Sequence, residues 1–591
     1  MKRIKFRIII PTFLLLTIVV VACSKSFLDK PPQGVLNPAT MASEAGVQGI
    51  LIGAYSLVDG AGATGDDETS AASNWVFGGV AGDDAYKGSD PTDFSSIAVL
   101  EDWSVNPTSD VTIHKWKLCY TGAQRCNDVL KTLPLATDIP AAEAVQIRAQ
   151  AVFLRAYYHM ELKKVYGNII YADTTVNPSN TVQTNTTDVW PNIEADLNYA
   201  VANLPASWGT SDPGRANVWA AKAMLAKAYM YEGKLPAAYD ILKDIIANGV
   251  TSAGAKYALT PIFFSNFNPA QKNGSECVFA AQTSVQDGSS VDWGGDPNGN
   301  FGDILNFPYT GGPGACCGFY NPSQDLANAF KTDIAGLPLL DTWYQGNNVS
   351  DPTTPYTGTL DPRIDLTMGR KGIPYLDWGT HPGDAWIRNP VNDGHFSPRK
   401  NVYAASQKGY TDVGSAYWAP TELVANNVNI IRFADVILWA AECAADAGDL
   451  TSAMNYVNQI RARAANTTGW VYKNSDYDAT SATYKDHTTP ADNYKIGLYT
   501  SFPSKDYAVK AIQFERRLEL AMEGQRFFDL VRWGTADQVL NAYYGREKAY
   551  RPLKQNAHWT KGKNEILPIP QSEIDNMNSD GTIRLTQNPG Y

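Results

Sequence analysis

Long apolar runs are missing from most of this 591-residue sequence, which excludes a membrane-spanning helix beyond the first 22 residues. Such a helix needs about 20 consecutive apolar residues. Histidine is also scarce, with six residues, and none of them stand at the spacing of metal ligands. We therefore predict no metal site, and nothing in the sequence calls for a cofactor.

Catalytic motifs are absent as well. The sequence has no GxSxG, HExxH, Walker A or GxGxxG pattern, and each of these marks a large class of enzymes. One class stays open, because a glycosidase needs only a pair of carboxylates and the chain has 60 acidic residues. Without a second supporting feature, we predict that the protein is not an enzyme.

Cysteines are few and irregularly spaced. Seven are present with no CxxC pair, so neither a zinc site nor a disulfide scaffold is indicated. Cys316 and Cys317 are adjacent in a segment rich in Gly and Pro. Two states fit this pair equally well, a strained vicinal disulfide or two reduced, half-buried thiols.

Acidic residues outnumber basic ones, 60 to 49. The net charge is −11, and it becomes −15 once the four basic residues of the first seven positions are removed. Binding to phosphate backbones depends on Lys and Arg. The body of the protein is therefore not expected to bind nucleic acid.

The first 22 residues have the composition of a secretory signal peptide, with a basic start and an apolar run over residues 8–22. The string VVVAC, which ends at Cys23, loosely resembles a lipobox, since Val20 stands where Leu is usual. We predict that Cys23 is lipidated. Three acyl chains anchor a protein stably, because each buried CH₂ contributes about 0.8 kcal/mol. The alternative is a secreted protein in which Cys23 is incidental.

Apolar residues recur at helical spacing over both ends of the chain. The predicted helices cover residues 111–132, 142–166, 188–203, 216–232, 236–248, 430–447, 450–465 and 506–530.

Two of these regions look alike. In residues 221–242 and 436–457, a helix, a Gly-x-Leu turn and a second helix follow one another. Ala226 and Ala441 precede the turn glycine by seven positions, and small residues there allow close packing. This pattern is typical of tetratricopeptide-like helical hairpins, which stack into a rigid scaffold, and two unrelated hairpins are the simpler alternative.

Loops rich in Gly, Pro, Asn, Asp and aromatic residues interrupt the helices. We expect a mainly α protein with a large loop-rich insertion, because loops on a rigid scaffold often carry function. The predicted organisation is a signal peptide (1–22), a lipidated tether (23–43), an N-terminal helical scaffold (44–250) with a ligand-site loop (59–110), a loop-rich ligand-binding insertion (251–428) and C-terminal helical hairpins with a signature segment (429–591).

One loop, Asp296-Pro-Asn-Gly-Asn300, resembles the start of an EF-hand, since oxygen ligands recur at alternate positions. Its sixth position is Phe301 rather than Gly, and no Glu closes it. An Asx turn is the better interpretation, with calcium as the minor one.

Five segments resemble the SusD/RagB family of surface glycan-binding lipoproteins from Bacteroidota, and together they span the mature chain. They are CSKSFLDKPP (23–32), IRFADVILWAAECAADAGD (431–449), ERRLELAMEGQRFFDLVRWG (515–534), NEILPIPQSEIDNMN (564–578) and the terminal QNPGY (587–591). The third segment alternates charges along a helix, with Glu519 and Glu523 four residues apart. The resemblance implies that these charges are structural and not catalytic.

The resemblance also implies a fold and a function. The fold is a scaffold of four tetratricopeptide-like hairpins with a loop-rich face that binds ligand. The function is capture of oligo- or polysaccharide at the cell exterior, on the outer membrane, for a SusC-like TonB-dependent transporter on which the protein sits as a lid. The membrane is reached through the lipid alone. Peptide or another nutrient is the alternative ligand, since a fold does not fix its ligand.

We predict that the ligand site combines two loop-rich stretches, 74–94 and 291–322. Both place aromatic rings beside Gly and Asp, and the rings would stack on sugars while carboxylates bind hydroxyl groups. The candidate contacts are Trp75, Asp83, Asp84, Tyr86, Trp293, Tyr309, Phe319 and Tyr320. If these prove structural, the site is expected around Trp343, Trp378 and Trp386.

Overall fold

The computed structural model describes most of the chain, and the candidate residues Cys23 and Trp293 lie outside the described part. It describes residues 38–591 except 64–66, 177–182, 290–296, 315, 413–422 and 550.

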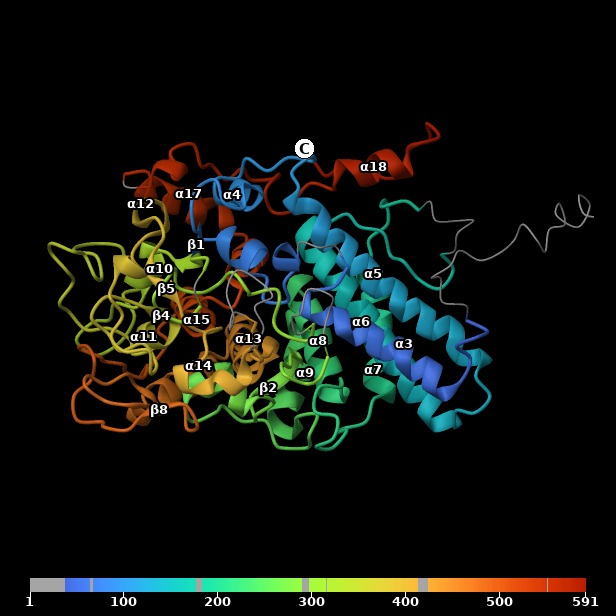
Figure 1. The fold of residues 1–591 in the computed structure, drawn as a ribbon, viewed down its shortest axis with the longest axis horizontal. Helices are drawn as coiled ribbons and strands as arrows, with labels where there is room; N and C mark the ends of the chain where they lie inside the picture. Colours follow the sequence, from blue (N-terminus) through green and yellow to red (C-terminus); the bar gives the residue numbers. More distant parts are fainter. Residues whose placement is uncertain are drawn as a thin grey trace, which may run out of the picture.

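Long helices form the scaffold and pack on one another in an unbroken array (Figure 1). The predicted boundaries agree to within three residues for all of them. The array runs from α5 (Val111–Thr132) through α6 (Ala141–Tyr166), α7 (Trp190–Asn203), α8 (Val218–Tyr231) and α9 (Leu235–Asn248) to α13 (Phe433–Asp446) and α14 (Leu450–Ala464).

Two helices of this array, α8 and α14, begin at side-chain caps. Asn217 accepts a hydrogen bond from the backbone N–H of Ala220 at the start of α8, and Asp449 accepts one from Ser452 at the start of α14. Each cap satisfies a backbone donor that would otherwise lack a partner, and contributes about 1 kcal/mol.

The two predicted hairpins are present as α8–α9 and α13–α14. Their turn glycines, Gly233 and Gly448, have φ of 72° and 82°, values that only Gly adopts readily. Ala226 and Ala441 are fully buried, so the helices approach closely. Because α9 packs on α13, the hairpins stack although about 180 residues separate them in sequence.

The remaining helices are short, apart from α3 and α17, and most belong to the loop-rich end or the C-terminal segment. They are α3 (Glu44–Ser56), α4 (Ser95–Glu101), α10 (Gln324–Ala329), α11 (Ile364–Thr367), α12 (Pro390–Asp393), α17 (Ala536–Glu547) and α18 (Gln571–Met577). No helix in the described ranges is long and apolar enough to cross a membrane.

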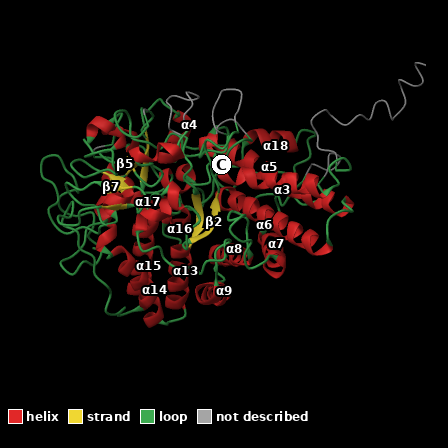
Figure 2. Ribbon diagram, turned by 60° about the horizontal axis from the view of Figure 1, so that its bottom comes forward, coloured by secondary structure: helices red, strands yellow, loops and turns green. Residues whose placement is uncertain are grey.

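Strands are short and pair only in twos within the described residues, always antiparallel. Figure 2 shows loops gathered at the end of the molecule opposite α3, α5 and α7. The pairs are β1 (Ala85–Gly88) with β3 (Phe319–Pro322), β2 (Cys277–Ala281) with β6 (Val428–Arg432), β4 (Met368–Gly369) with β5 (Ser397–Pro398) and β7 (Tyr477–Asp478) with β8 (Thr483–Tyr484).

The prediction of one helix over 506–530 is wrong. Two helices, α15 (Lys505–Leu520) and α16 (Arg526–Arg532), are separated by a turn in which Met522 and Gly524 have φ of 63° and 64°. A Cβ on Gly524 would lie 1.9 Å from the carbonyl oxygen of Ser73. The helix therefore breaks because this turn must pack directly against the backbone of a distant loop.

Charged residues of α15 are buried rather than displayed along its surface. Glu515, Arg517 and Glu519 are at most 3% exposed, and their partners come from other elements. We call the set around Glu519 the buried ion network, in which five cations meet five carboxylates. Its members are Arg363, Lys400, Arg432, Arg461, Arg463, Glu276, Asp361, Glu515, Glu519 and Glu523.

Candidate functional site

The two loop-rich stretches predicted to form the site do meet. Strand β1 pairs with β3, which sets Tyr86 opposite Asn321 and Gly88 opposite Phe319. The Ser323 hydroxyl extends the contact by donating to the carbonyl of Asp83 at 2.6 Å. The structure thus joins residues 83–89 to residues 318–323, more than 200 positions away.

Most of the predicted aromatic contacts are buried in this junction. Trp75 is fully buried, and its indole N–H donates to the Gly302 carbonyl at 2.9 Å. The hydroxyl of Tyr86 donates to Glu547 at 2.9 Å. Phe319 packs edge-on against Trp75. The structure contradicts the prediction that these three rings are open to a ligand, because the loops need them as their own core.

Asp83 and Asp84 are likewise committed to internal partners. Both pair with Arg517 at 3.0 Å, and Asp83 also pairs with Arg526 at 2.7 Å. Burial works to raise the pKa of Asp83, but the two arginines hold it well below its usual range. For Asp84 burial prevails and raises the pKa. Neither carboxylate faces solvent, so the prediction that they bind sugar hydroxyls is contradicted here.

Tyr309 and Tyr320 keep the predicted role as candidates. Tyr309 is half-buried, and the guanidinium of Arg388 lies 5.3 Å from its ring centre. Tyr320 is 4% exposed, yet it lines the pocket described below. The reserve site does not form as one cluster, since Trp343 packs on Phe514 of α15.

The other two reserve residues lie around one tyrosine. The backbone N–H of Trp378 donates to the Tyr375 carbonyl at 3.1 Å, and the Trp386 ring lies 5.8 Å from the Tyr375 ring. Cys316 and Cys317, nearby in sequence to Tyr309 and Tyr320, form a vicinal disulfide. Of the EF-hand-like loop, Asp296 lies outside the described residues, and the Asn298 amide donates to Asp287, eleven residues earlier, at 2.8 Å.

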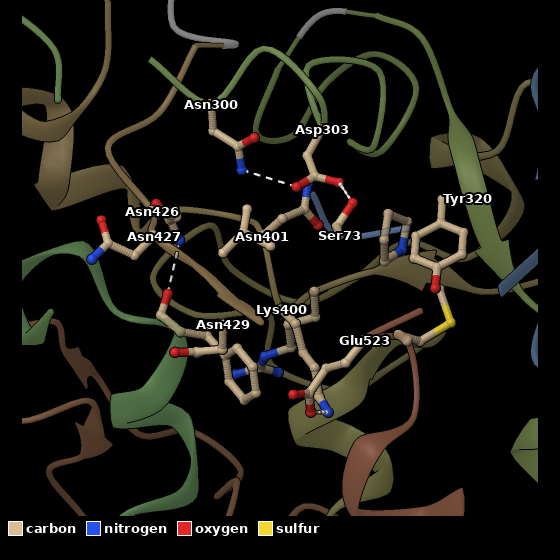
Figure 3. Close-up of a pocket in the computed structure, with 15 residues that line it drawn as sticks. Ser73, Asn300, Asp303, Tyr320, Lys400, Asn401, Asn426, Asn427, Asn429 and Glu523 are labelled. Carbon is tan, nitrogen blue, oxygen red and sulfur yellow. Dashed lines mark hydrogen bonds and ion pairs between the residues drawn. The ribbon is translucent and has the colours of Figure 1, made fainter. Parts of the chain in front are cut away.

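A pocket opens beside Tyr320, and we call it the asparagine pocket (Figure 3). Its space is about 580 Å³ when the open solvent at its mouth is counted. Side chains from seven separate segments line it. They are Ser73, Phe267, Asn300, Asp303, Tyr320, Pro398, Arg399, Lys400, Asn401, Asn426, Asn427, Val428, Asn429, Met522 and Glu523.

One wall of the pocket is built around Asp303. Its carboxylate accepts hydrogen bonds from the Ser73 hydroxyl at 2.7 Å and from the amides of Asn300 and Asn306 at 2.9 Å each. Figure 3 shows Asn300 and Ser73 directed at this carboxylate. The wall is therefore rigid, and it joins the first loop stretch to the second.

The opposite wall belongs to the buried ion network. The Lys400 ammonium donates to Glu523 at 2.7 Å, and Arg432 donates to the same carboxylate at 2.8 Å. Burial lowers the pKa of Lys400 to about 8, although Glu523 opposes this shift. Glu523 reaches the pocket because the helix breaks after Leu520, so the signature segment supplies part of the site.

Sequence reasoning missed the asparagines of this pocket. Asn426, Asn427 and Asn429 precede and enter β6, and their only signal was a polar ANNVN string directly before a predicted helix. The prediction relied on aromatic residues in loops instead. Amides, carboxylates and a tyrosine around one cavity can bind a ligand rich in hydroxyl groups, because such side chains both donate and accept hydrogen bonds. No group of three or more His, Cys, Asp or Glu side chains that could hold a metal occurs in the described ranges.

The fold and the pocket define a class of protein, a stack of helical hairpins whose loops enclose a polar pocket on one side. Comparison with known proteins gives the family. A family model described as "SusD family" matches residues 275–591, which is more than half of the chain, and the chain belongs to that family. A second model, described as "Starch-binding associating with outer membrane", matches residues 26–230.

Individual relatives are similar over nearly the whole length. The chain is 25% identical to SusD-like protein P25 of Formosa agariphila, over 93% of each chain. It is 24% identical to a SusD-like protein of Bacteroides ovatus, over 90% of this chain and 83% of that one.

Solved structures share the fold. One is a laminarin binding SusD-like protein, with a TM-score of 0.67 and 22% identity over 93% of this chain and 100% of the other. Another is surface glycan-binding protein A from Bacteroides thetaiotaomicron in complex with laminarihexaose, with a TM-score of 0.62 and 21% identity over 92% and 99%. The predicted family and helical fold class are confirmed.

Proposed function

We propose that this chain is a lipid-anchored protein of the outer membrane that binds oligo- or polysaccharide at the cell surface. It passes the glycan to a SusC-like TonB-dependent transporter and does not itself cleave it. The observation that carries the proposal is the asparagine pocket, in which loops from both halves of a rigid scaffold bring amides, carboxylates and a tyrosine together. Membership of the SusD family supports it.

The names of solved structures with the same fold support a glycan as the ligand. One structural neighbour is named for laminarin, and another was solved with laminarihexaose. Laminarin and starch are therefore the first polysaccharides to test on this chain. Lack of catalysis is supported by Asp303, because its carboxylate already accepts three hydrogen bonds and is not placed as a free acid or base.

The proposal is tested by affinity electrophoresis and calorimetry with the protein lacking residues 1–23. The panel contains laminarin, starch, xylan and pectin, with a casein digest as the peptide arm. We expect saturable binding of at least one polysaccharide and none of the peptides. Binding of peptides alone would contradict the proposal, and so would release of reducing sugar from a bound polysaccharide by the purified protein.

The lipid anchor gives a separate prediction. Replacing Cys23 by Ala is expected to leave folding unchanged and to move the full-length protein from the detergent phase to the aqueous phase in Triton X-114 partitioning. The reason is that the acylated thiol is the only proposed membrane attachment, and its acyl chains supply the binding energy. A control is Cys277→Ala, because Cys277 is half-buried within the folded body. Equal partitioning of Cys23→Ala and the unaltered protein would contradict the prediction.

A further inference from the structure

The asparagine pocket contains hydrogen-bond acceptors that lack donors. The amide of Asn300 donates to Asp303 at 2.9 Å, and the amide of Asn426 donates to the Phe267 carbonyl at 2.8 Å. Neither Oδ1 atom has a hydrogen-bond partner among the residues that the structure describes. Asn300 is 2% exposed and Asn426 is 3% exposed, so bulk water does not satisfy these oxygens.

Buried acceptors without partners are unusual, and each destabilises a fold by about 1–3 kcal/mol. Most such groups in proteins are satisfied by an ordered water or a ligand. Both oxygens belong to side chains that line one cavity. The cavity therefore suits an occupant that brings hydrogen-bond donors to these two places.

The pocket also contains a carboxylate, that of Asp303, which is not paired with a cation among the described residues. Asp303 forms no ion pair among the described residues, and its partners are a hydroxyl and two neutral amides. Burial raises its pKa, an effect that the three hydrogen bonds oppose. A second anion placed nearby would be repelled, because like charges at short range in a poorly solvated site are unfavourable.

Neither of the two cations that line the pocket is paired with Asp303 among the described residues. Lys400 is already paired with Glu523 at 2.7 Å. The terminal nitrogens of Arg399 donate to the Pro374 carbonyl and to the Tyr484 hydroxyl, each at 3.2 Å, and neither of those residues lines the pocket. The pocket thus presents acceptors and a carboxylate, and the two terminal nitrogens of Arg399 are directed at partners outside its lining.

Apolar surface completes the lining. Phe267, Tyr320, Val428 and Met522 all belong to the pocket wall. A sugar ring has C–H faces as well as hydroxyl groups, and it can contact such side chains while it donates to the amide oxygens. Water molecules have no apolar surface to place against these side chains, so the lining suits a sugar better than water.

We propose that the asparagine pocket holds one residue of an uncharged glycan, whose hydroxyl groups donate to Asn300 and Asn426, and that it rejects glycans carrying uronate or sulfate at that position. This inference rests on the proposed function and makes it more specific. A glycan whose charged groups lie outside the pocket is not affected by it.

The test uses maltohexaose, cellohexaose and laminarihexaose, each compared with its C6-oxidised, uronate-bearing form by calorimetry. We expect at least one neutral hexasaccharide to bind, and its oxidised form to bind about tenfold more weakly or worse, the difference that one lost hydrogen bond plus repulsion produces. Asp303→Asn removes the charge. This variant is expected to reduce the ratio of the affinity for the neutral hexasaccharide to the affinity for its oxidised form. A purely structural role for Asp303 would change both affinities together.

A matched pair of variants locates the site. Asn429→Leu removes a half-buried amide that lines the pocket and donates to the Asn266 carbonyl at 2.9 Å. Asn203→Leu removes a half-buried amide that makes the same kind of bond, to the Tyr199 carbonyl at 2.8 Å, on α7. We expect the first to weaken binding about tenfold and the second to leave it unchanged, with equal melting temperatures.

The outcomes separate the inference from the proposed function. If a hexasaccharide binds but Asn429→Leu has no effect, the inference is overturned and the glycan-binding function stands. Oxidised forms that bind as tightly as neutral ones, or more tightly, also overturn it. The group to examine is then Arg399, whose Nε has no hydrogen-bond partner in the described part of the chain. If no hexasaccharide and no polysaccharide of the panel binds, the proposed function fails together with the inference.

Discussion

Replacing Arg517 by Met is expected to lower the free energy of unfolding by about 3–5 kcal/mol, the usual loss when one member of a buried ion pair is removed. The guanidinium pairs with Asp83, Asp84 and Asp325, each at 3.0 Å, and all three carboxylates are at most 4% exposed. No other cation among the described residues forms an ion pair with Asp84, so its charge would remain buried and unpaired.

Urea denaturation at neutral pH measures this effect, with the protein lacking residues 1–23. The control is Arg148→Met on α6, an exposed arginine whose side chain lies over the Tyr199 ring. The control is expected to stay within about 0.5 kcal/mol of the unaltered protein, as most surface substitutions do. A loss for Arg517→Met no larger than that of the control would show that the three carboxylates do not need this cation.

Glu519→Gln is the second substitution with a large expected effect, again about 3–5 kcal/mol. Glu519 is fully buried and accepts from Arg432 at 2.7 Å, from Arg363 at 3.0 Å and from Arg463. With five cations and five carboxylates the buried ion network is neutral, and this change leaves one positive charge unbalanced. Gln keeps the shape of the side chain, so the loss reports on the charge and on the acceptor oxygen that becomes an NH₂ group.

The pH dependence of this loss has a definite sign. Burial works to raise the pKa of Glu519, but the three arginines hold it well below the ordinary value of 4.5. The stabilisation by the ionised carboxylate is complete above the unfolded pKa and is lost as the pH falls through the lower folded pKa. The difference between the two proteins is therefore expected to be largest near pH 7 and to shrink as the pH falls below about 4.5.

Glu547→Gln serves as the control for that experiment, because Glu547 is equally buried but has the opposite shift. Burial raises the pKa of Glu547 to about 7, which Arg551 and the Tyr86 hydroxyl oppose. At pH 6 this carboxyl is mostly protonated, and Gln resembles that neutral form, so little stability is lost. Equal losses for Glu519→Gln and Glu547→Gln at pH 6 would contradict the assignment of charge to Glu519.

The scaffold could be predicted from sequence because its determinants are local. The spacing of apolar residues predicted the bounds of α5 correctly. The Gly-x-Leu turns predicted both hairpins, because their glycines adopt a positive φ. The helix break after Leu520 could not be predicted, because its cause is the approach of Gly524 to a loop about 450 residues earlier. Nothing in the residues around the break shows that contact.

Only part of the candidate site could be predicted from the sequence. The two stretches were correctly expected to meet, yet Trp75, Tyr86 and Phe319 stabilise their junction instead of facing a ligand. An aromatic residue flanked by Gly and Asp has the same local pattern in either role. The asparagine pocket depends on seven segments that converge only in the folded chain, so no single string of residues could indicate it.

The contact between Asp84 and Arg517 also sets an order of events during synthesis. The two residues are 433 positions apart, and at 5–20 residues per second a ribosome needs roughly 20–90 s to add the arginine after the aspartates. Over that interval the loop that carries Asp83 and Asp84 has no cation to bury against, so it cannot close. The contact of this loop with Arg517 is therefore expected to form late, after nearly the whole chain has been made, whereas α5 to α9 have their packing partners much earlier.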